Sequence, residues 1–216
     1  VIIPSFAVGR TQELIYSLNK EYEKFERQRR LLHDTPVYID SPLAISATEV
    51  FQKNTDCFDD EARAYIESGD HPLDFDNLHF TKTADESRQL NEDPDSKIII
   101  SASGMCEAGR IRHHLKHNLW RKDSTVIFVG YQARGTLGRA LVDGAKTVRI
   151  FGEEIAVKAR IEMIEGFSGH ADRDGLLEWV AAMKQKPKRI MLAHGEPAVI
   201  ASFQKPTRHQ LGIPAV

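Results

Sequence analysis

Short apolar segments alternate along the chain with segments of helical periodicity, and this alternation constrains the fold more than any other feature. The apolar segments are VIIPSF, PVYIDS, KIIISAS and STVIFVG, at residues 1–6, 36–41, 97–103 and 124–130. They are apolar at successive positions, a pattern typical of parallel strands that helices cover on both faces. The spacing of apolar residues between them predicts helices. We therefore expect a Rossmann-like α/β layer over residues 1 to about 143.

The pattern changes after this layer. TVRIF and IAVKARIEMI indicate strands joined by a tight turn at Gly152, followed by a helix in RDGLLEWVAAM and a buried strand in RIMLAH. This last piece has only about 50 residues, so its sheet needs a partner sheet to close a core. The chain also opens without Met on an apolar strand, and we expect it to be a fragment of a longer protein.

Composition excludes several classes of protein. Hydrophobic residues make up 41% and charged residues 28%, as in a soluble globular protein. The net charge of −2 gives no global attraction to nucleic acid, so a polyanion site must be a local basic patch. Cys57 and Cys106 form neither a disulfide framework nor a metal knuckle, and indicate reduced cytosolic thiols. No apolar run approaches a membrane span and no signal peptide is visible.

The stretch GFSGHADRDG joins small residues, a His and two Asp residues just before a helix. Gly169 permits backbone conformations denied to other residues, and Ser168 and nearby amides can donate to an anion. Asp172 or Asp174 is a natural helix N-cap. His170 therefore lies where a phosphate could bind and a proton could be delivered. The alternative is a capped helix with a surface His.

The stretch RIMLAHGEP places His194 just after an expected strand. Ligand groups gather at the carboxyl ends of strands in α/β proteins. His194 could bind a metal, with Glu196 orienting a ring or backbone nearby. The alternative is a structural His.

The stretch SASGMCEAGR again runs from a strand through small residues into a helix. Ser101, Ser103 and Gly104 could hold a phosphate, with Arg110 nearby. The Gly-Lys-Ser/Thr ending of a P-loop is missing. In the following helix, His113 and His117 share one face, which could clamp a metal. No Glu of the HExxH kind lies between them and the helix is locally cationic, which favours a structural or phosphate-facing basic helix.

Two further strand-to-helix turns are rich in small residues and Arg. FAVGRTQEL places Arg10 at the first, and GYQARGTLGRAL contributes Arg134 and Arg139 at the second. These loops either converge on one edge of the sheet or are ordinary turns.

Five segments of the sequence, taken together, resemble the β-CASP branch of the metallo-β-lactamase superfamily. The members of this branch are RNA-processing nucleases. The segments are IPSFAVGRTQEL, SASGMCEAGRIRHHLKHNLW, VGYQARGTLGRAL, GFSGHADR and LAHGE. They are similar to the pre-mRNA 3′-end endonuclease, its bacterial and archaeal relatives and, more distantly, the J-type ribonucleases. The resemblance implies a Rossmann-like β-CASP domain over residues 1–166. Residues 167–216 would then be the C-terminal part of a metallo-β-lactamase αββα domain.

The resemblance also implies roles for individual residues. The family site holds two zinc ions that activate a bridging hydroxide for attack on phosphorus. LAHGE implies His194 as a zinc ligand, and SGHAD implies His170 as the group that contacts the scissile phosphate and protonates the leaving oxygen. The residues expected to contact phosphate or the RNA backbone are Ser168, Gly169, Ser101, Ser103, Gly104, Arg10 and Arg110.

The family's His-x-His-x-Asp-His motif is absent from these 216 residues, as is the acidic residue expected to pair with His170. Because a zinc site takes about four ligands, we expect the fragment to bind no zinc stably and to be inactive. The full-length parent is expected to be a cytoplasmic zinc-dependent ribonuclease that hydrolyses RNA phosphodiesters, with RNA but no membrane as partner and a homodimer as a candidate assembly.

Two other classes of protein stay open. The first is a non-catalytic β-CASP scaffold or RNA-binding subunit of a processing complex. The second is a Rossmann-like nucleotide-binding module unrelated to RNA, although GxGxxG is missing after the first strand.

Overall fold

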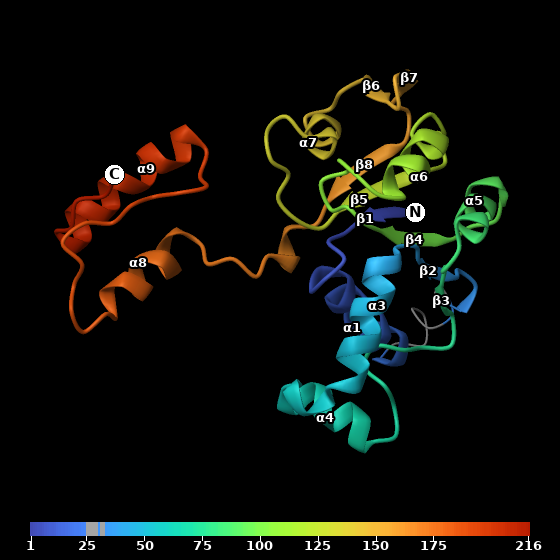
Figure 1. Cartoon of the computed structure of the whole chain (residues 1–216), viewed down its shortest axis with the longest axis horizontal. Helices are drawn as coiled ribbons and strands as arrows, with labels where there is room; N and C mark the ends of the chain where they lie inside the picture. Colours follow the sequence, from blue (N-terminus) through green and yellow to red (C-terminus); the bar gives the residue numbers. More distant parts are fainter. Residues whose placement is uncertain (25–29, 31–32) are drawn as a thin grey trace. The chain divides into compact units, whose positions relative to one another are not determined.

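The computed structural model describes residues 1–24, 30 and 33–216, and the chain forms two compact units (Figure 1). Unit 1 comprises Val1–Ser168 and unit 2 comprises Gly169–Val216. The family boundary expected after residue 166 stays a prediction, because a division by contacts need not coincide with a division by family.

Unit 1 is built on a six-stranded sheet in which every neighbouring pair is parallel. The strand order is β3-β2-β4-β1-β5-β8. The strands are β1 (Ile2–Pro4), β2 (Val37–Ile39), β3 (Leu78–Phe80), β4 (Ile98–Ser101), β5 (Thr125–Phe128) and β8 (Arg160–Met163). β1 lies at the centre, where Ile2 pairs with Ile99 on one side and Val126 on the other. The predicted α/β fold with a parallel sheet is confirmed.

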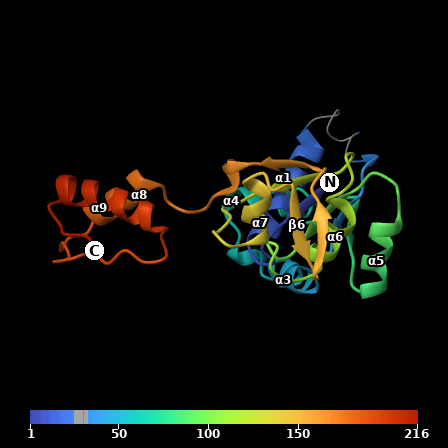
Figure 2. The same cartoon turned by 90° about the horizontal axis from the view of Figure 1, so that it is seen from above.

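Helices cover both faces of this sheet. The helices described in unit 1 are α1 (Arg10–Lys24), α3 (Pro42–Lys53), α4 (Asp60–Glu67), α5 (Ala84–Glu92), α6 (Ile111–Asn118) and α7 (Leu137–Val142), with 3-10 turns at Thr55–Cys57 and Glu165–Phe167. In Figure 1, α6 and α7 lie on one side of the strands and α1 and α3 on the other, and Figure 2 shows the same helices from above. None of the helices described in either unit is long and apolar enough to cross a bilayer.

Two apolar clusters explain why the strands are apolar at successive positions. Ile3 belongs to the cluster that contains Ile15 of α1, whereas its neighbour Ile2 belongs to the cluster that contains Leu115 of α6. Successive side chains of a strand point to opposite faces, so a strand between two layers of helices must be apolar at both.

A two-stranded antiparallel hairpin follows α7. β6 (Thr147–Ile150) pairs with β7 (Glu153–Ala156) through the two-residue turn Phe151–Gly152. Both turn residues have positive φ, 52° and 83°, as the tightest hairpin turns require. The predicted turn at Gly152 is confirmed. The expected end of the layer near residue 143 is wrong, because the chain returns to the main sheet as β8, parallel to β5.

Unit 2 contains α8 (Arg173–Ala181) and α9 (Pro197–Leu211). Asp172 caps α8 by accepting a hydrogen bond from the Gly175 N–H at 2.8 Å, as one of the two predicted caps. The buried strand predicted at residues 189–194 is wrong: Ile190 forms an isolated bridge with Ala215, and Met191 is 82% exposed. A strand needs a sheet beside it, and only the last residues of the chain pair with this segment in the described part.

Candidate nucleic-acid interface and metal ligand

Loops that follow three neighbouring strands meet at the carboxyl edge of the sheet in unit 1. The Ser5 N–H donates to Ser101 O at 3.0 Å, which joins the end of β1 to the end of β4. Gln132, after β5, donates from Nε2 to Gly104 O at 3.0 Å. The expectation that these small-residue loops converge is therefore met for the loops after β1, β4 and β5, at the edge where α/β proteins gather ligand groups.

The conformation of the loop after β4 is fixed mainly by contacts within the loop. Gly109 has φ 81°, and a Cβ there would collide with the carbonyl oxygen of Ala102, so this position requires glycine. The Ser103 hydroxyl accepts hydrogen bonds from the Glu107 and Ala108 N–H groups, at 3.1 and 3.2 Å. A Cβ on Gly104 would come within 3.0 Å of the Phe6 ring. Of the predicted phosphate contacts, Ser103 thus orders its own loop and Gly104 leaves room for an aromatic ring.

Three further predicted RNA contacts of unit 1, which are Ser101, Arg10 and Arg110, already have internal partners. The Ser101 hydroxyl is buried and donates to Asp40 O at 2.7 Å. Arg10 pairs with Glu13. Arg110, whose side chain is 19% exposed, donates to Asp40 Oδ1 at 2.6 Å and to two backbone carbonyls of residues 81 and 82. Arg110 therefore ties the ends of β2 and β3 to the start of α6.

A buried polar network lies beneath this edge, and the sequence analysis did not identify its centre, Asp40. The carboxylate of Asp40 is fully buried. His114 Nε2 lies 2.6 Å from Asp40 Oδ2, and the Ser87 hydroxyl donates to the same oxygen at 2.5 Å. Burial alone would raise the pKa of Asp40, but the hydrogen bonds from His114, Ser87 and Arg110 outweigh it and lower the pKa below its usual value. The local signal was an Asp at a strand's carboxyl end.

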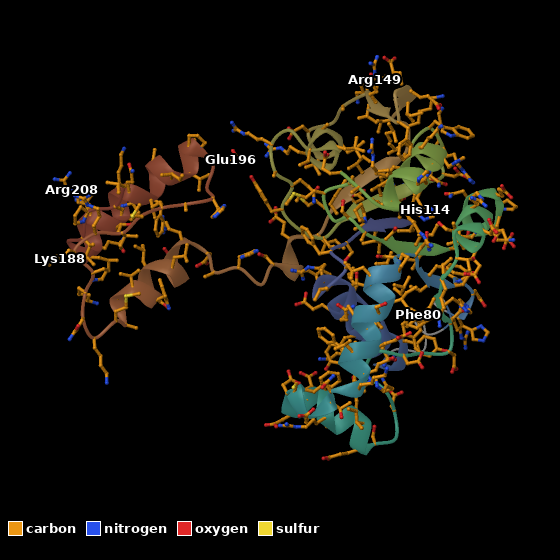
Figure 3. All side chains as sticks on the ribbon, in the orientation of Figure 1. Phe80, His114, Arg149, Lys188, Glu196 and Arg208 are labelled. Carbon is orange, nitrogen blue, oxygen red and sulfur yellow. The ribbon has the colours of Figure 1, made fainter. Side chains whose placement is uncertain are left out.

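Both ring nitrogens of His114 face oxygen atoms. Its Nδ1 lies 2.9 Å from Asn91 Oδ1, and this oxygen also accepts from Asn118 Nδ2. The Asn91 Nδ2 donates to Ser87 O, so the orientation of the amide is consistent with all its partners. Each ring nitrogen thus lies within hydrogen-bond distance of a buried oxygen, which fixes the orientation of the ring. Figure 3 shows His114 on α6 beside the strands and α5.

Two large aromatic side chains are exposed after adjacent strands. Phe6, after β1, is 51% exposed, and Tyr131, after β5, is 58% exposed. Phe6 contacts the loop at Gly104, whose carbonyl is bound by Gln132, the neighbour of Tyr131. The sequence analysis did not select either residue as a site candidate, although an aromatic beside a loop of small residues was the available signal.

The remaining predicted site residues lie around the start of unit 2 and before α9. Ser168, Gly169 and His170 are exposed in the segment that leads into α8. His194 is also exposed and has φ 63°, a left-handed conformation uncommon outside glycine. Glu196 directly precedes α9. Their predicted roles stay predictions.

Metal ligands do not gather anywhere in the described part of the chain: no three His, Cys, Asp or Glu residues lie close enough to hold an ion. The pair His113 and His117 therefore has no third ligand among the described residues, and the ring of His113 packs against Phe151 with centroids 4.6 Å apart.

Comparison with known domains and proteins identifies what the chain is similar to. Residues 11–141 match the Beta-Casp domain, and residues 154–216 match the Zn-dependent metallo-hydrolase RNA specificity domain. The chain is 35% identical over 205 residues to Ribonuclease TTHA0252 of Thermus thermophilus, covering 95% of this chain and 45% of that protein. It is 35% identical over 214 residues to an RNase J-like protein of Methanocaldococcus jannaschii, covering 99% and 47%.

A third relative carries a different name. Transcription termination factor FttA of Methanocaldococcus jannaschii is 32% identical over 214 residues, covering 96% of this chain and 33% of that protein. The chain thus spans between a third and about half of the length of these relatives.

Proposed function

Because the chain belongs to the β-CASP family of RNA-processing nucleases, we propose that it forms the RNA-holding part of a zinc-dependent ribonuclease that hydrolyses phosphodiester bonds. The observation that carries the proposal is the match of two family domains in sequence, which together span most of residues 11–216. A relative named as a ribonuclease supports the same reaction class.

The described residues do not by themselves fit a zinc site, since a zinc ion takes about four ligands and no group of three gathers here. We propose that His194 supplies one ligand and that residues outside these 216 supply the others. The absence of His-x-His-x-Asp-His from the sequence supports this division. On this proposal the 216 residues alone bind no zinc stably and are inactive.

His170 is proposed to contact the scissile phosphate and to protonate the leaving oxygen. It lies exposed two residues before the cap of α8, where the helix N-terminus favours nearby negative charge. Ser168 and Gly169 would line the same phosphate position.

The carboxyl edge of unit 1 is proposed to hold the RNA. Arg10, Ser103 and Gly104 would contact the backbone directly, Arg10 by exchanging its ion pair with Glu13 for a phosphate and Ser103 and Gly104 through the loop that they shape. Ser101 and Arg110 would act by holding the strand ends in place, because their polar groups already bind Asp40 and neighbouring carbonyls.

The test uses the full-length protein and measures zinc content and RNA cleavage. His194→Ala is expected to lose both zinc and cleavage. His170→Ala is expected to keep zinc and to lose roughly 10²–10⁴-fold in cleavage rate, as for a general acid. His209→Ala, on the last turn of α9, is the matched control and should retain both. Full activity in the first two variants would refute the site assignment.

The similarity to FttA favours a second candidate, a role in transcription termination, which is compatible with the nuclease proposal. A non-catalytic scaffold or RNA-binding subunit predicts instead that the full-length protein binds RNA without cleaving it. The cleavage assay separates these alternatives.

We propose further that the full-length protein has RNA but no membrane as its partner, that it is located in the cytoplasm and that it forms a homodimer. Cell fractionation tests the location, and light scattering of the purified protein tests the assembly.

A further inference from the structure

A pocket of about 370 Å³ lies between α6, α7 and β6 in unit 1. Arg112 and Arg149 line it together with apolar side chains such as Leu137 and Val148. Gly135 and Thr136, from the loop after β5, and Glu107, from the loop after β4, complete its wall. The pocket is therefore built partly from loops of the carboxyl edge. Figure 3 shows Arg149 on the β6–β7 hairpin.

The two arginines differ from most others in the described part of the chain. Arg10, Arg110, Arg121 and Arg139 each pair with an acidic side chain. Neither Arg112 nor Arg149 forms an ion pair or a side-chain hydrogen bond with any described residue. The Nε atom of Arg112 is buried without a hydrogen-bond partner, and its guanidinium lies 4.5 Å from the centre of the Phe151 ring. A buried, unsatisfied donor on a cation is costly unless a ligand binds it.

The acidic residues near the pocket do not neutralise these arginines. Glu107 accepts the Leu137 N–H at 2.6 Å. Glu154 lies directly opposite Arg149 in the hairpin without an ion pair between them. Burial, followed by the positive charges of His114, His117, Lys116 and Arg112, lowers the pKa of His113 on the same helix, as expected in a cationic environment.

We propose that this pocket binds a phosphate group of single-stranded RNA, with Arg112 and Arg149 as its two cationic contacts; this rests on the RNA function proposed above. Guanidinium groups bind phosphate oxygens through paired, charge-assisted hydrogen bonds. The apolar wall accommodates the sugar or base of one nucleotide, and the volume lies within the range of small-ligand pockets. RNA that lies along the carboxyl edge would reach the pocket through the loops after β4 and β5.

The test measures the salt dependence of RNA binding by the full-length protein. The probe is a fluorescent single-stranded oligouridylate, and a His170→Ala background limits cleavage during the measurement. Each phosphate contact contributes about 0.7 to the slope of log K against log salt concentration for a single strand. Arg112→Gln and Arg149→Gln should each reduce the slope, and the double variant should reduce it by about 0.7, the contribution of the one phosphate that both arginines contact. Arg121→Gln is the matched control, because Arg121 pairs with Asp123 before β5, and should leave the slope unchanged.

The outcomes separate this proposal from the one on which it rests. If the parent protein does not bind the oligouridylate, the RNA function fails. If it binds and the double variant keeps the parent slope, the pocket assignment fails. Arg149 is exposed, so Arg149→Gln tests the site even if Arg112→Gln disturbs folding. Uridine monophosphate is the second probe: if it binds the parent but not the double variant while the RNA slope is unchanged, the pocket takes a free nucleotide and the RNA assignment is overturned.

Discussion

Replacing Asp40 by Asn would leave Arg110 and His114 without their carboxylate partner in the interior of unit 1. His114 and Asp40 are both fully buried, and Arg110 is 19% exposed. Removing one partner of a buried ion pair typically costs 3–5 kcal/mol, because the other charge stays desolvated. Arg110 would keep its bonds to the carbonyls of residues 81 and 82, so we expect the lower end, about 3 kcal/mol.

Thermal unfolding of the full-length protein measures this cost. For a domain of 150–250 residues, about 3 kcal/mol corresponds to a fall in Tm of roughly 6–12 °C. Hydrogen exchange of peptides from β2 and α6 would assign the change to unit 1. Asp123→Asn is the matched control, because it removes a carboxylate that is 73% exposed and also pairs with an arginine. The control is expected to leave Tm unchanged.

The pH dependence of Tm provides a second, independent test of the role of Asp40. The folded-state pKa of Asp40 is lower than its usual value of 3.8. The charged carboxylate therefore contributes its full stabilisation of the fold at pH values above about 3.8. This stability is lost as pH falls through the lowered pKa. The difference in Tm between the parent and Asp40→Asn should therefore be full near neutral pH and should narrow as pH falls below about 3.8. A fall in Tm no larger than that of the control, or a gap that does not narrow on acidification, would refute the reasoning.

Three further predictions concern single residues. Gly109→Ala should lower Tm, because it adds a Cβ against a backbone carbonyl at φ 81°, and should also weaken RNA binding through the loop after β4. Tyr131→Ala should weaken binding of single-stranded RNA by about 1–3 kcal/mol if a base stacks on its ring, as fluorescence anisotropy would show. Cys106 is buried and its pKa is raised to about 12, so mass spectrometry after alkylation at pH 8 should find it unmodified while the exposed Cys57 reacts.

Local sequence patterns predicted most strands and helices of unit 1 because each carries its signal in neighbouring residues. The apolar runs became β1, β2, β4 and β5. β3 was missed because its three residues, LHF, stand in a polar stretch without an apolar run. The segment 189–194 shows the opposite error: an apolar run forms no strand where the described chain offers it no sheet.

The candidate site was predicted only as a set of separate motifs. Small-residue loops after strands marked the carboxyl edge correctly, because parallel strands bring their ends to one side. The contacts of those residues were not predictable, since the pairs that hold the edge are distant in sequence. Asp40 lies 74 residues from His114 and 70 from Arg110.

The sequence by itself determined the parallel sheet and the family, because apolar periodicity and ordered motifs are local properties of the chain. Only the tertiary structure decided which cations are available to a ligand. Arg110 and Arg112 are two positions apart in one basic stretch. The fold brings Asp40 into contact with Arg110, whereas no acidic residue in the described part of the chain pairs with Arg112. The availability of an arginine for phosphate depends on long-range packing, and a local pattern does not encode it.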